Sequence, residues 1–491
     1  MTWEGLLAAT VLIPTALACV TAVTRGPATT VVGFVSTLIS ALLALATAAR
    51  VTLAGPLEHQ LAGWAPPLGI TLRADGLTAI LLGLTAIVGS LTACYAATRS
   101  ITHGGDRRFW PLLLLLWAGI AGVALSGDLF NLYVALEVVT LSAVGLVALG
   151  GRDALEPALR YLLVAVFGSM LYLLAVAMIY GMTGTLDLQE AGALIAADPS
   201  ADTRWPLALA VVGLGIKAAL LPLHAWLPPA HAAAPAAVSP LLSALVVKAG
   251  FIVTVRLWFD VLGPDAAVAA ALGGCAAAAV LGAGLLALVQ RRLKRVVAYS
   301  TVAQVGYLYL LFPLTAATDD PAVQRLLWGG AMTMLVAHGV AKAALFLAAG
   351  SLKLSAGTDD LDGIVGAARH LGTLSLTMML TGISLVGLPI SLGFAGKWLL
   401  LSGALGAGQW WAVLVVLVGS LLAAAYLLRP VAAVLRDSDE HEEVGRAELH
   451  TLPWALRYLP LALALLAIVL GLSARWLSEL SLIGSSLGGM P

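Results

Sequence analysis

The sequence predicts an all-α, polytopic membrane protein with about fourteen transmembrane helices. Of its 491 residues, 60% are hydrophobic and only 11% are charged, whereas about a quarter of the residues in soluble domains are charged. Apolar runs of about 20 residues recur along the chain, and a helix of that length crosses the roughly 30 Å hydrocarbon core of a bilayer. We therefore expect a multi-pass protein of the cell inner (plasma) membrane.

The expected helices follow one another through short loops. Their centres lie near Ile13, Ser40, Thr85, Leu116, Thr140, Leu171, Val212, Val247, Ala278, Tyr307, Val336, Ser384, Val418 and Leu465. Between the second and third helices, the amphipathic stretch 51–73 is expected to lie at the outer surface. The longest polar stretch, 436–450, is expected to be a charged, solvated connector before the last helix.

Arginine and lysine residues predict the orientation of the chain. They gather in the odd-numbered loops, at Arg25, Arg99, Arg107, Arg108, Arg152, Arg160, the cluster 291–295, Lys353, Arg369, Arg436 and Arg446. Cytoplasmic loops are enriched in basic residues. The odd-numbered loops are therefore expected inside the cell and both termini outside.

A weak internal repeat predicts two related halves. The sixth helix ends in MIYGMTGTLDLQ (178–189) and the eleventh in AAGSLKLSAGTDDLDG (348–363), so both exits contain Gly-Thr followed by Asp-Leu. The copies are five helices apart, and an odd spacing inverts the second copy, as in many transporters. We expect N-terminal helices 1–3 over 1–109, a first five-helix repeat over 110–260, an inverted second repeat over 261–436, and the connector with helix 14 over 437–491.

The seventh and twelfth helices correspond in the two repeats, and both are expected to be broken. Pro222, Pro228 and Pro229 interrupt the seventh, and LPISLGFAGKW (388–398) interrupts the twelfth. Proline removes a backbone donor, so the freed carbonyl groups must face protein or water rather than lipid. Broken helices at matching places in two halves are typical of an ion site.

Charged side chains inside the apolar helices form the candidate site. A lysine at the centre of a spanning helix costs at least about 2.5 kcal/mol, which favours a functional role. Glu137 in the fifth helix and Lys217 before the break in the seventh are expected to form a switchable ion pair; a fixed pair that only anchors two helices is the alternative. Lys248 in the eighth helix could take the next step. For both lysines the alternative is snorkelling to the interface.

The remaining candidates lie within the eleventh helix, after the break in the twelfth, and in the turns after Lys217. His338 and Lys342 share one face of that helix, and histidine is a natural proton relay, although a histidine satisfied in the core is the alternative. Lys397, after the break in the twelfth helix, is expected to be an exit gate, or else an interfacial anchor. His224 and His231 could line a proton-uptake funnel or could be loop histidines.

Three other charged residues are interpreted structurally. Asp75 and Asp128 stand at helix starts, where an aspartate caps free N–H groups. Arg256, near the end of the eighth helix, is expected to snorkel.

No motif indicates a cofactor or a metal. The three cysteines are scattered singly, so iron–sulfur and zinc sites have no support. The sequence contains neither a GxxxxGKS/T phosphate loop nor a GxGxxG fingerprint on a strand–helix turn. The zero formal net charge gives no reason to expect nucleic acid. We therefore expect an ion gradient or a partner subunit to drive the protein.

Several motifs resemble one known family. The runs KAALLPLHAWLPPAHAAAPAAVSPLLSALVVKAG (217–250), AHGVAKAALFLAAG (337–350) and GFAGKW (393–398), with the Glu137 helix, are similar to the antiporter-like subunits of multisubunit sodium/proton antiporters, respiratory complex I and membrane-bound hydrogenases. The resemblance covers helices four to thirteen and is best for the D-type antiporter subunit. It implies fourteen helices, two inverted five-helix repeats, partner membrane subunits, and a proton path through Glu137, Lys217, Lys248, His338 and Lys397.

Two functions follow as alternatives. One is a proton-translocating subunit of a multisubunit cation (sodium)/proton antiporter. The other is a proton-pumping membrane module of a redox-driven complex I-like or hydrogenase assembly, or of an inorganic-carbon uptake complex. A purely structural membrane anchor would instead predict that neutralising Lys217 changes nothing.

Overall fold

The computed structural model describes residues 3–67, 69–103, 105–198, 200–367, 370–436 and 452–487. Within these ranges eleven helices are long and apolar enough to cross a membrane, and three shorter apolar helices accompany them. Every expected helix centre falls within a helix. The predicted helical membrane fold is therefore confirmed. The expected connector lies outside the described residues from 437 to 450, as do Arg369 and Arg446 of the orientation argument.

Within the described residues, the first half of the chain supplies eleven helices. They are α1 (Trp3–Val23), α2 (Ala28–Ala54), α3 (Gly76–His103), α4 (Phe109–Leu125), α5 (Leu129–Ala148), α6 (Leu155–Thr183), α7 (Leu188–Ala197), α8 (Arg204–Lys217), α9 (Leu227–Ala233), α10 (Val238–Leu241) and α11 (Val247–Arg256). A π-helical turn, Leu242–Val246, joins α10 to α11, and a second, Leu257–Val261, extends α11. The eighth expected helix is therefore one continuous, buried helix that contains two π-helical turns.

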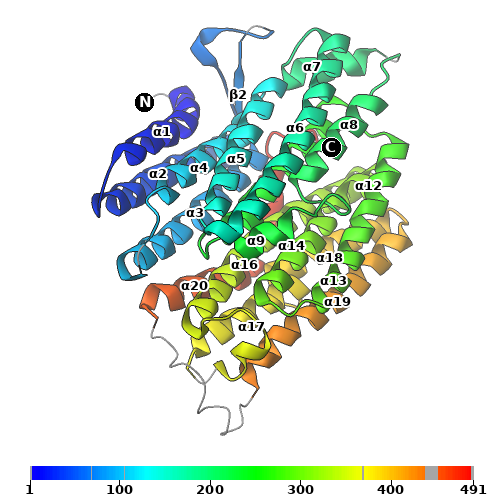
Figure 1. Cartoon of the computed structure of the whole chain (residues 1–491). Coiled ribbons are helices and arrows are strands. Elements are labelled where there is room, and N and C mark those ends of the chain that lie inside the picture. The colour runs from blue at the N-terminus through cyan, green and yellow to red at the C-terminus, as the bar shows by residue number, and fades with distance from the viewer. Residues whose placement is uncertain are drawn as a thin grey trace.

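The described part of the second half supplies ten helices. They are α12 (Ala266–Ala278), α13 (Gly284–Leu288), α14 (Leu293–Tyr309), α15 (Leu311–Ala316), α16 (Pro321–Ala356), α17 (Gly372–Val386), α18 (Leu392–Gly406), α19 (Trp410–Leu435), α20 (Trp454–Val469) and α21 (Ala474–Leu482). Figure 1 shows α1 and α2 at one side of the bundle and α19 at the opposite side.

A small β-hairpin departs from the all-helical expectation. Strands β1 (Leu57–Gln60) and β2 (Thr71–Ala74) pair antiparallel, with Leu57 opposite Ala74. The hairpin occupies most of the stretch 51–73 and stands at the end of the bundle where α7 lies (Figure 1). Gln189 of α7 donates a hydrogen bond to Glu58 of β1 at 3.1 Å, which joins these two peripheral elements.

Helix α16 forms the centre of the bundle. It has 36 residues, and every residue from Leu327 to Leu352 is buried. It packs against α14, α17, α18 and α20. A helix that is apolar on all faces is expected in such a position. His338 and Lys342 therefore lie in a stretch of helix that is enclosed by protein on all sides.

Two matching backbone bridges support the predicted repeat. The residue before α5, Asp128, bridges to Asp187 after α6, and the residue before α14, Arg292, bridges in the same way to Asp360 after α16. Helices α6 and α16 also end alike, at Gly184 and Gly357, each with φ of 72° in the left-handed region that glycine favours. The inverted relation of the halves and their boundaries stay predictions.

Candidate functional site

The break in the seventh expected helix lies where the prolines predict it. Helix α8 ends at Lys217 and α9 begins only at Leu227. The carbonyl of Ile216, at the end of α8, accepts a hydrogen bond from Trp226 Nε1 at 2.8 Å. The break thus leaves Lys217 at a helix terminus inside the protein, with its side chain only 6% exposed.

At the break in the twelfth expected helix, the lysine lies within the second helical segment rather than at the end of the first. Helix α17 ends at Val386 and α18 begins at Leu392. Lys397 of α18 reaches back across the break and donates to Leu385 O and Val386 O, both at 3.0 Å, and to Ser420 Oγ at 3.2 Å. Gly387 has φ of 85°, and a Cβ there would lie 2.8 Å from Lys397 Cδ. The lysine side chain therefore fills the space that a larger residue would need.

Glu137 and Lys217 form the predicted ion pair. Lys217 Nζ lies 3.0 Å from Glu137 Oε1 and donates to Thr140 Oγ1 at 2.6 Å. The hydroxyl of Ser169, on α6, also donates to Glu137 Oε1. Helices α5, α6 and α8 thus converge on one carboxylate, whose side chain is 20% exposed.

Helix α11 packs directly against this ion pair. A Cβ on Gly250 would lie 2.8 Å from Leu214 O and 3.1 Å from Lys217 Cβ. Only glycine permits so close an approach of two helices. The contact brings the helix that carries Lys248 against the end of α8.

Lys248 and His338 form the next contact. Lys248 Nζ lies 2.7 Å from His338 Nδ1 and donates to Ser243 O at 2.6 Å. Lys342, one turn beyond His338, donates to Val297 O at 2.9 Å and contacts the hydroxyl of Ser300. Lys248 and Lys342 are fully buried, so neither snorkels.

Polar side chains of α14 lie near both Lys342 and Lys397. Thr301 shares a 2.9 Å hydrogen bond with Ser243, and Gln304 donates to Leu385 O at 3.0 Å. Leu385 O also accepts from Lys397, and the Lys397 ammonium lies 4.4 Å from the centre of the Tyr307 ring. Sequence reasoning missed this strip, although Ser300, Thr301 and Gln304 stand out as polar residues in one apolar helix.

His231 belongs with the lysine cluster, whereas His224 lies at its edge. His231, on α9, is fully buried and stacks on Phe346 with ring centres 4.4 Å apart. The reading of His231 as a loop histidine is therefore wrong. It lies within electrostatic range of Lys248, Lys294 and Lys342. His224 is partly buried in the break after α8.

Lys294 is a buried base that sequence reasoning missed. Its side chain is 3% exposed and donates to Ala234 O at 2.7 Å. In the sequence Lys294 is part of the basic cluster 291–295, which the orientation argument assigned to a loop. Because Lys294 stands among other basic residues, the sequence does not show that its side chain is buried.

Arg256 does not snorkel, so that expectation was wrong. It is 8% exposed and donates to both carboxylate oxygens of Asp75, at 2.6 and 2.8 Å, and to Asp260 at 3.3 Å. Asp75 also caps α3, accepting from Thr78 N at 3.1 Å. Burial alone would raise the pKa of Asp75. The charge and hydrogen bonds of Arg256 lower it by more than burial raises it, so the pKa of Asp75 lies below its ordinary value. The expected cap at Asp128 is confirmed by a 2.6 Å bond from Asn131 N.

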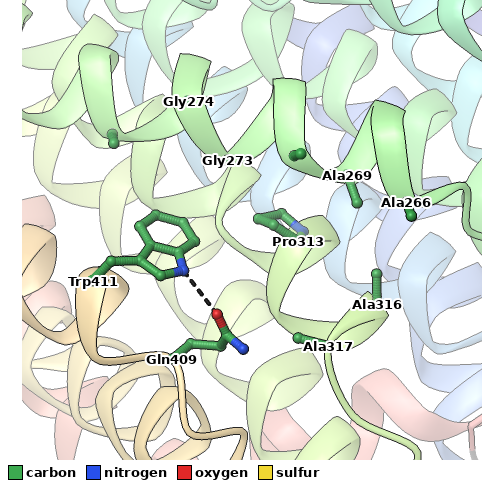
Figure 2. Close-up of a pocket in the computed structure, with 11 residues that line it drawn as sticks. Ala266, Ala269, Gly273, Gly274, Pro313, Ala316, Ala317, Gln409 and Trp411 are labelled. Carbon is green, nitrogen blue, oxygen red and sulfur yellow. Dashed lines mark hydrogen bonds between the residues drawn. The ribbon is translucent and has the colours of Figure 1, made fainter.

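An apolar groove lies away from these residues. Figure 2 shows it between α12, α15 and α19, where Trp411 donates to Gln409. Its volume is about 470 Å³, and its lining is Ala266, Ala269, Ala270, Gly273, Gly274, Ala277, Pro313, Ala316, Ala317, Gln409 and Trp411. This lining contains no ionisable side chain, so the groove is not part of the charged site. Across the described ranges, no three His, Cys, Asp or Glu residues are placed to hold a metal ion.

One family matches the segment that contains every candidate residue. The family described as NADH:quinone oxidoreductase/Mrp antiporter, transmembrane, matches residues 126–423, which is more than half of the chain. The chain belongs to this family. The expected resemblance is therefore confirmed, and the protein is a multi-pass, antiporter-like membrane subunit of this proton-translocating family.

Relatives of two kinds match nearly the whole chain. The N subunit of the NADH-quinone oxidoreductase of Desulforudis audaxviator (strain MP104C) is 35% identical over 442 residues, which are 87% of this chain and 86% of the relative. The D subunit of the Na(+)/H(+) antiporter of Bacillus subtilis (strain 168) is 30% identical over 424 residues, 85% of this chain and 83% of the relative. A chain of the Mrp complex from Dietzia sp. DQ12-45-1b superposes with a TM-score of 0.86 at 27% identity, covering 98% of this protein and 96% of that chain.

Proposed function

We propose that this protein translocates protons as one subunit of a multisubunit cation (sodium)/proton antiporter. The observation that carries the proposal is the ion pair of Glu137 and Lys217, whose charged atoms are 3.0 Å apart at the end of a broken helix. An isolated pair could serve only to join helices. Here it is accompanied by four more buried lysines, Lys248, Lys294, Lys342 and Lys397, which a structural anchor does not need.

The contact between Lys248 and His338 supports a stepwise relay. One nitrogen must donate and the other must accept across their 2.7 Å separation. If both were protonated, neither could accept and two positive charges would repel each other. A proton that reaches this pair from Lys217 therefore favours release of another toward Lys342. The polar strip of α14 then leads to Lys397, our proposed exit gate.

The inlet and the orientation are part of the same proposal. His224 and His231 follow Lys217 along the chain. The positive charges of Lys248, Lys294 and Lys342 act on the His231 ring. We place proton uptake there, with the odd-numbered loops in the cytoplasm and both termini outside the cell. The first repeat, 110–260, would carry the ion pair, and the second, 261–436, the exit.

A partner membrane protein would dock beside the ion pair. The neighbouring face of α5 exposes Phe130, Val134 and Leu141, at 46%, 42% and 57% of their surface. Glu137 is itself 20% exposed there. A charge on a partner at this face could therefore bias the pair directly, because opposite charges interact strongly at a few ångströms in a low-dielectric setting.

A redox-driven complex I-like module, or a module of a hydrogenase or inorganic-carbon uptake assembly, is the second candidate. The 35% identity with the N subunit of an NADH-quinone oxidoreductase favours it. The relay residues would be the same in either assembly. Purification of the native complex separates the candidates, because small antiporter subunits would accompany this chain in one case and iron–sulfur or zinc proteins in the other.

The relay itself is tested by neutralising the ion pair in the assembled complex. We expect Glu137→Gln and Lys217→Ala each to abolish ion flux into membrane vesicles, since each removes one half of the charge pair. Glu156→Gln is a matched control, because Glu156 pairs with Arg160 on the exposed surface of α6, with its side chain 82% exposed. Normal flux in either assembled ion-pair variant would overturn the proposal.

A further inference from the structure

Ser169, on α6, faces two hydrogen-bond acceptors at once. Its hydroxyl contacts Glu137 Oε1 and lies 3.0 Å from Ala165 O, one turn back on its own helix. The residue is only 2% exposed, so water does not compete freely for the hydroxyl. A serine hydroxyl carries one hydrogen. Ser169 can therefore donate to Glu137 or to Ala165, but not fully to both.

The protonation state of Glu137 decides which acceptor receives that hydrogen. An ionised carboxylate can only accept, so Ser169 then donates to Glu137 Oε1, the same atom that accepts from Lys217 Nζ at 3.0 Å. A protonated Glu137 can instead donate to Ser169 Oγ. The Ser169 hydrogen is then free to rotate toward Ala165 O. The heavy atoms keep the same contacts, and the two arrangements differ only in the added proton and in the direction of the Ser169 O–H.

We infer that Ser169 is a positioning residue that satisfies both protonation states of Glu137. The inference rests on the proposed function, in which Glu137 gains and loses a proton. Without such a partner, a partly buried carboxyl would change its contacts each time a proton arrives. With Ser169, the carboxyl keeps a hydrogen bond in both states and stays within reach of Lys217.

Hydroxyl groups that contact both a helix carbonyl and an ionisable group recur along the relay, although beside a lysine the hydroxyl accepts rather than donates. Thr140 Oγ1 accepts from Lys217 at 2.6 Å and donates to Leu136 O at 2.8 Å. Ser300 contacts Lys342 Nζ and donates to Val297 O at 2.9 Å. Serine and threonine in helices often bond to a carbonyl of the preceding turn. The feature shared here is that the second partner is an ionisable relay group.

The test compares Ser169→Ala with wild type in the intact complex, as ion flux into vesicles across a range of pH. Hydrogen bonds to a charged group are roughly twice as strong as neutral ones, so loss of Ser169 disfavours the ionised form of Glu137 more than the protonated form. We expect flux at neutral pH to fall roughly tenfold and the pH midpoint to move about one unit toward alkaline pH. Ser169→Thr keeps the hydroxyl and should restore both.

The controls separate a positioning role from a structural one. Ser40→Ala is matched, because Ser40 is buried in α2 and donates to Ser36 O at 2.8 Å; its pH profile should equal wild type. If Ser169→Ala fails to assemble, Ser169→Cys retains the volume with a much weaker donor. An unshifted pH profile in assembled Ser169→Ala or Ser169→Cys, alongside an inactive Glu137→Gln, overturns this inference alone. Full activity of Glu137→Gln overturns the proposed function beneath it.

Discussion

The contact of Lys248 with His338 predicts which single residues the relay can lose. Water can bridge the gap that a missing histidine leaves, whereas Lys248 and Lys397 are the mid-membrane bases of α11 and α18. We expect Lys248→Ala and Lys397→Ala to block ion flux in vesicles, and His338→Ala only to slow it or shift its pH optimum. A His338→Ala variant that lost more flux than Lys248→Ala would require a different order of steps.

The buried pair of Asp75 and Arg256 predicts a loss of stability rather than of transport chemistry. Asp75→Ala leaves the buried Arg256 with only its longer 3.3 Å contact to Asp260, so it should destabilise the fold by about 3 kcal/mol, the lower end of the cost of breaking a buried ion pair. Thermal inactivation of the solubilised complex measures this. Asp106→Ala is the control, because Asp106 pairs with Arg108 at an exposed site, where loss of an ion pair costs little. Equal losses would contradict the assignment.

The same pair predicts a pH dependence. The pKa of Asp75 is lower in the folded protein than its ordinary value, which is about 3.9 in an unfolded chain. Its stabilisation is therefore fully present above that value and is lost as the pH falls through the folded-state pKa. The thermal stability of wild type and of Asp75→Ala should converge in acid.

The sequence predicts the ion-pair partners of some charged residues but not of others. Glu137 and Lys217 could be paired in advance, because each is a lone charge in a long apolar run. Arg256 could not be assigned to Asp75, because the two are far apart in sequence and Arg256 stands near a helix end where snorkelling is equally reasonable. Pairing across such distances depends on how the whole fold brings the start of α3 to the end of α11, which no local pattern encodes.

At the scale of elements, helices were predictable and the hairpin was not. Apolar length alone identifies a spanning helix, and the prolines placed the break after α8. Strands β1 and β2 have four residues each, too few for a clear alternation. Their position depends on distant contacts, such as Gly127 N donating to Thr71 O at 2.8 Å. The π-helical turns beside α11 likewise have no sequence signature here.

The close packing of α11 on α8 gives a prediction at this scale. In Gly250→Ala the new Cβ would meet backbone atoms, Leu214 O at 2.8 Å and Ala218 N at 2.9 Å, so the helices must separate. We expect a destabilisation of about 1–3 kcal/mol from overpacking, together with reduced ion flux. Gly83→Ala in α3 is the control, because nothing lies within 4 Å of its Cβ. Equal flux in both variants would show that helix spacing at Lys217 is unimportant.

At the scale of the whole molecule, we expect this chain alone not to catalyse robust antiport. A line of buried bases needs a trigger that changes which side they face, and a ligand can shift such an equilibrium only through different affinity for the two states. We propose that the trigger is the partner at the α5 face. Purified protein in liposomes with a pH gradient, tested with sodium, potassium and lithium, measures this. Coupled, saturable exchange at the rate of the intact complex would disprove it.

Lys217 and Lys397 differ in how their positive charge is balanced. Lys217 has the carboxylate of Glu137 beside it, so a proton shared within that pair changes little in net charge. Lys397 is bound by carbonyl groups, Ser420 and the Tyr307 ring, and within the described residues no carboxylate pairs with it. A proton on Lys397 is thus a net charge inside the bilayer, where a potential of 100 mV acts with up to about 2.3 kcal/mol per charge. We therefore propose that the membrane voltage acts more strongly on protonation of Lys397 than on proton transfer within the Glu137–Lys217 pair.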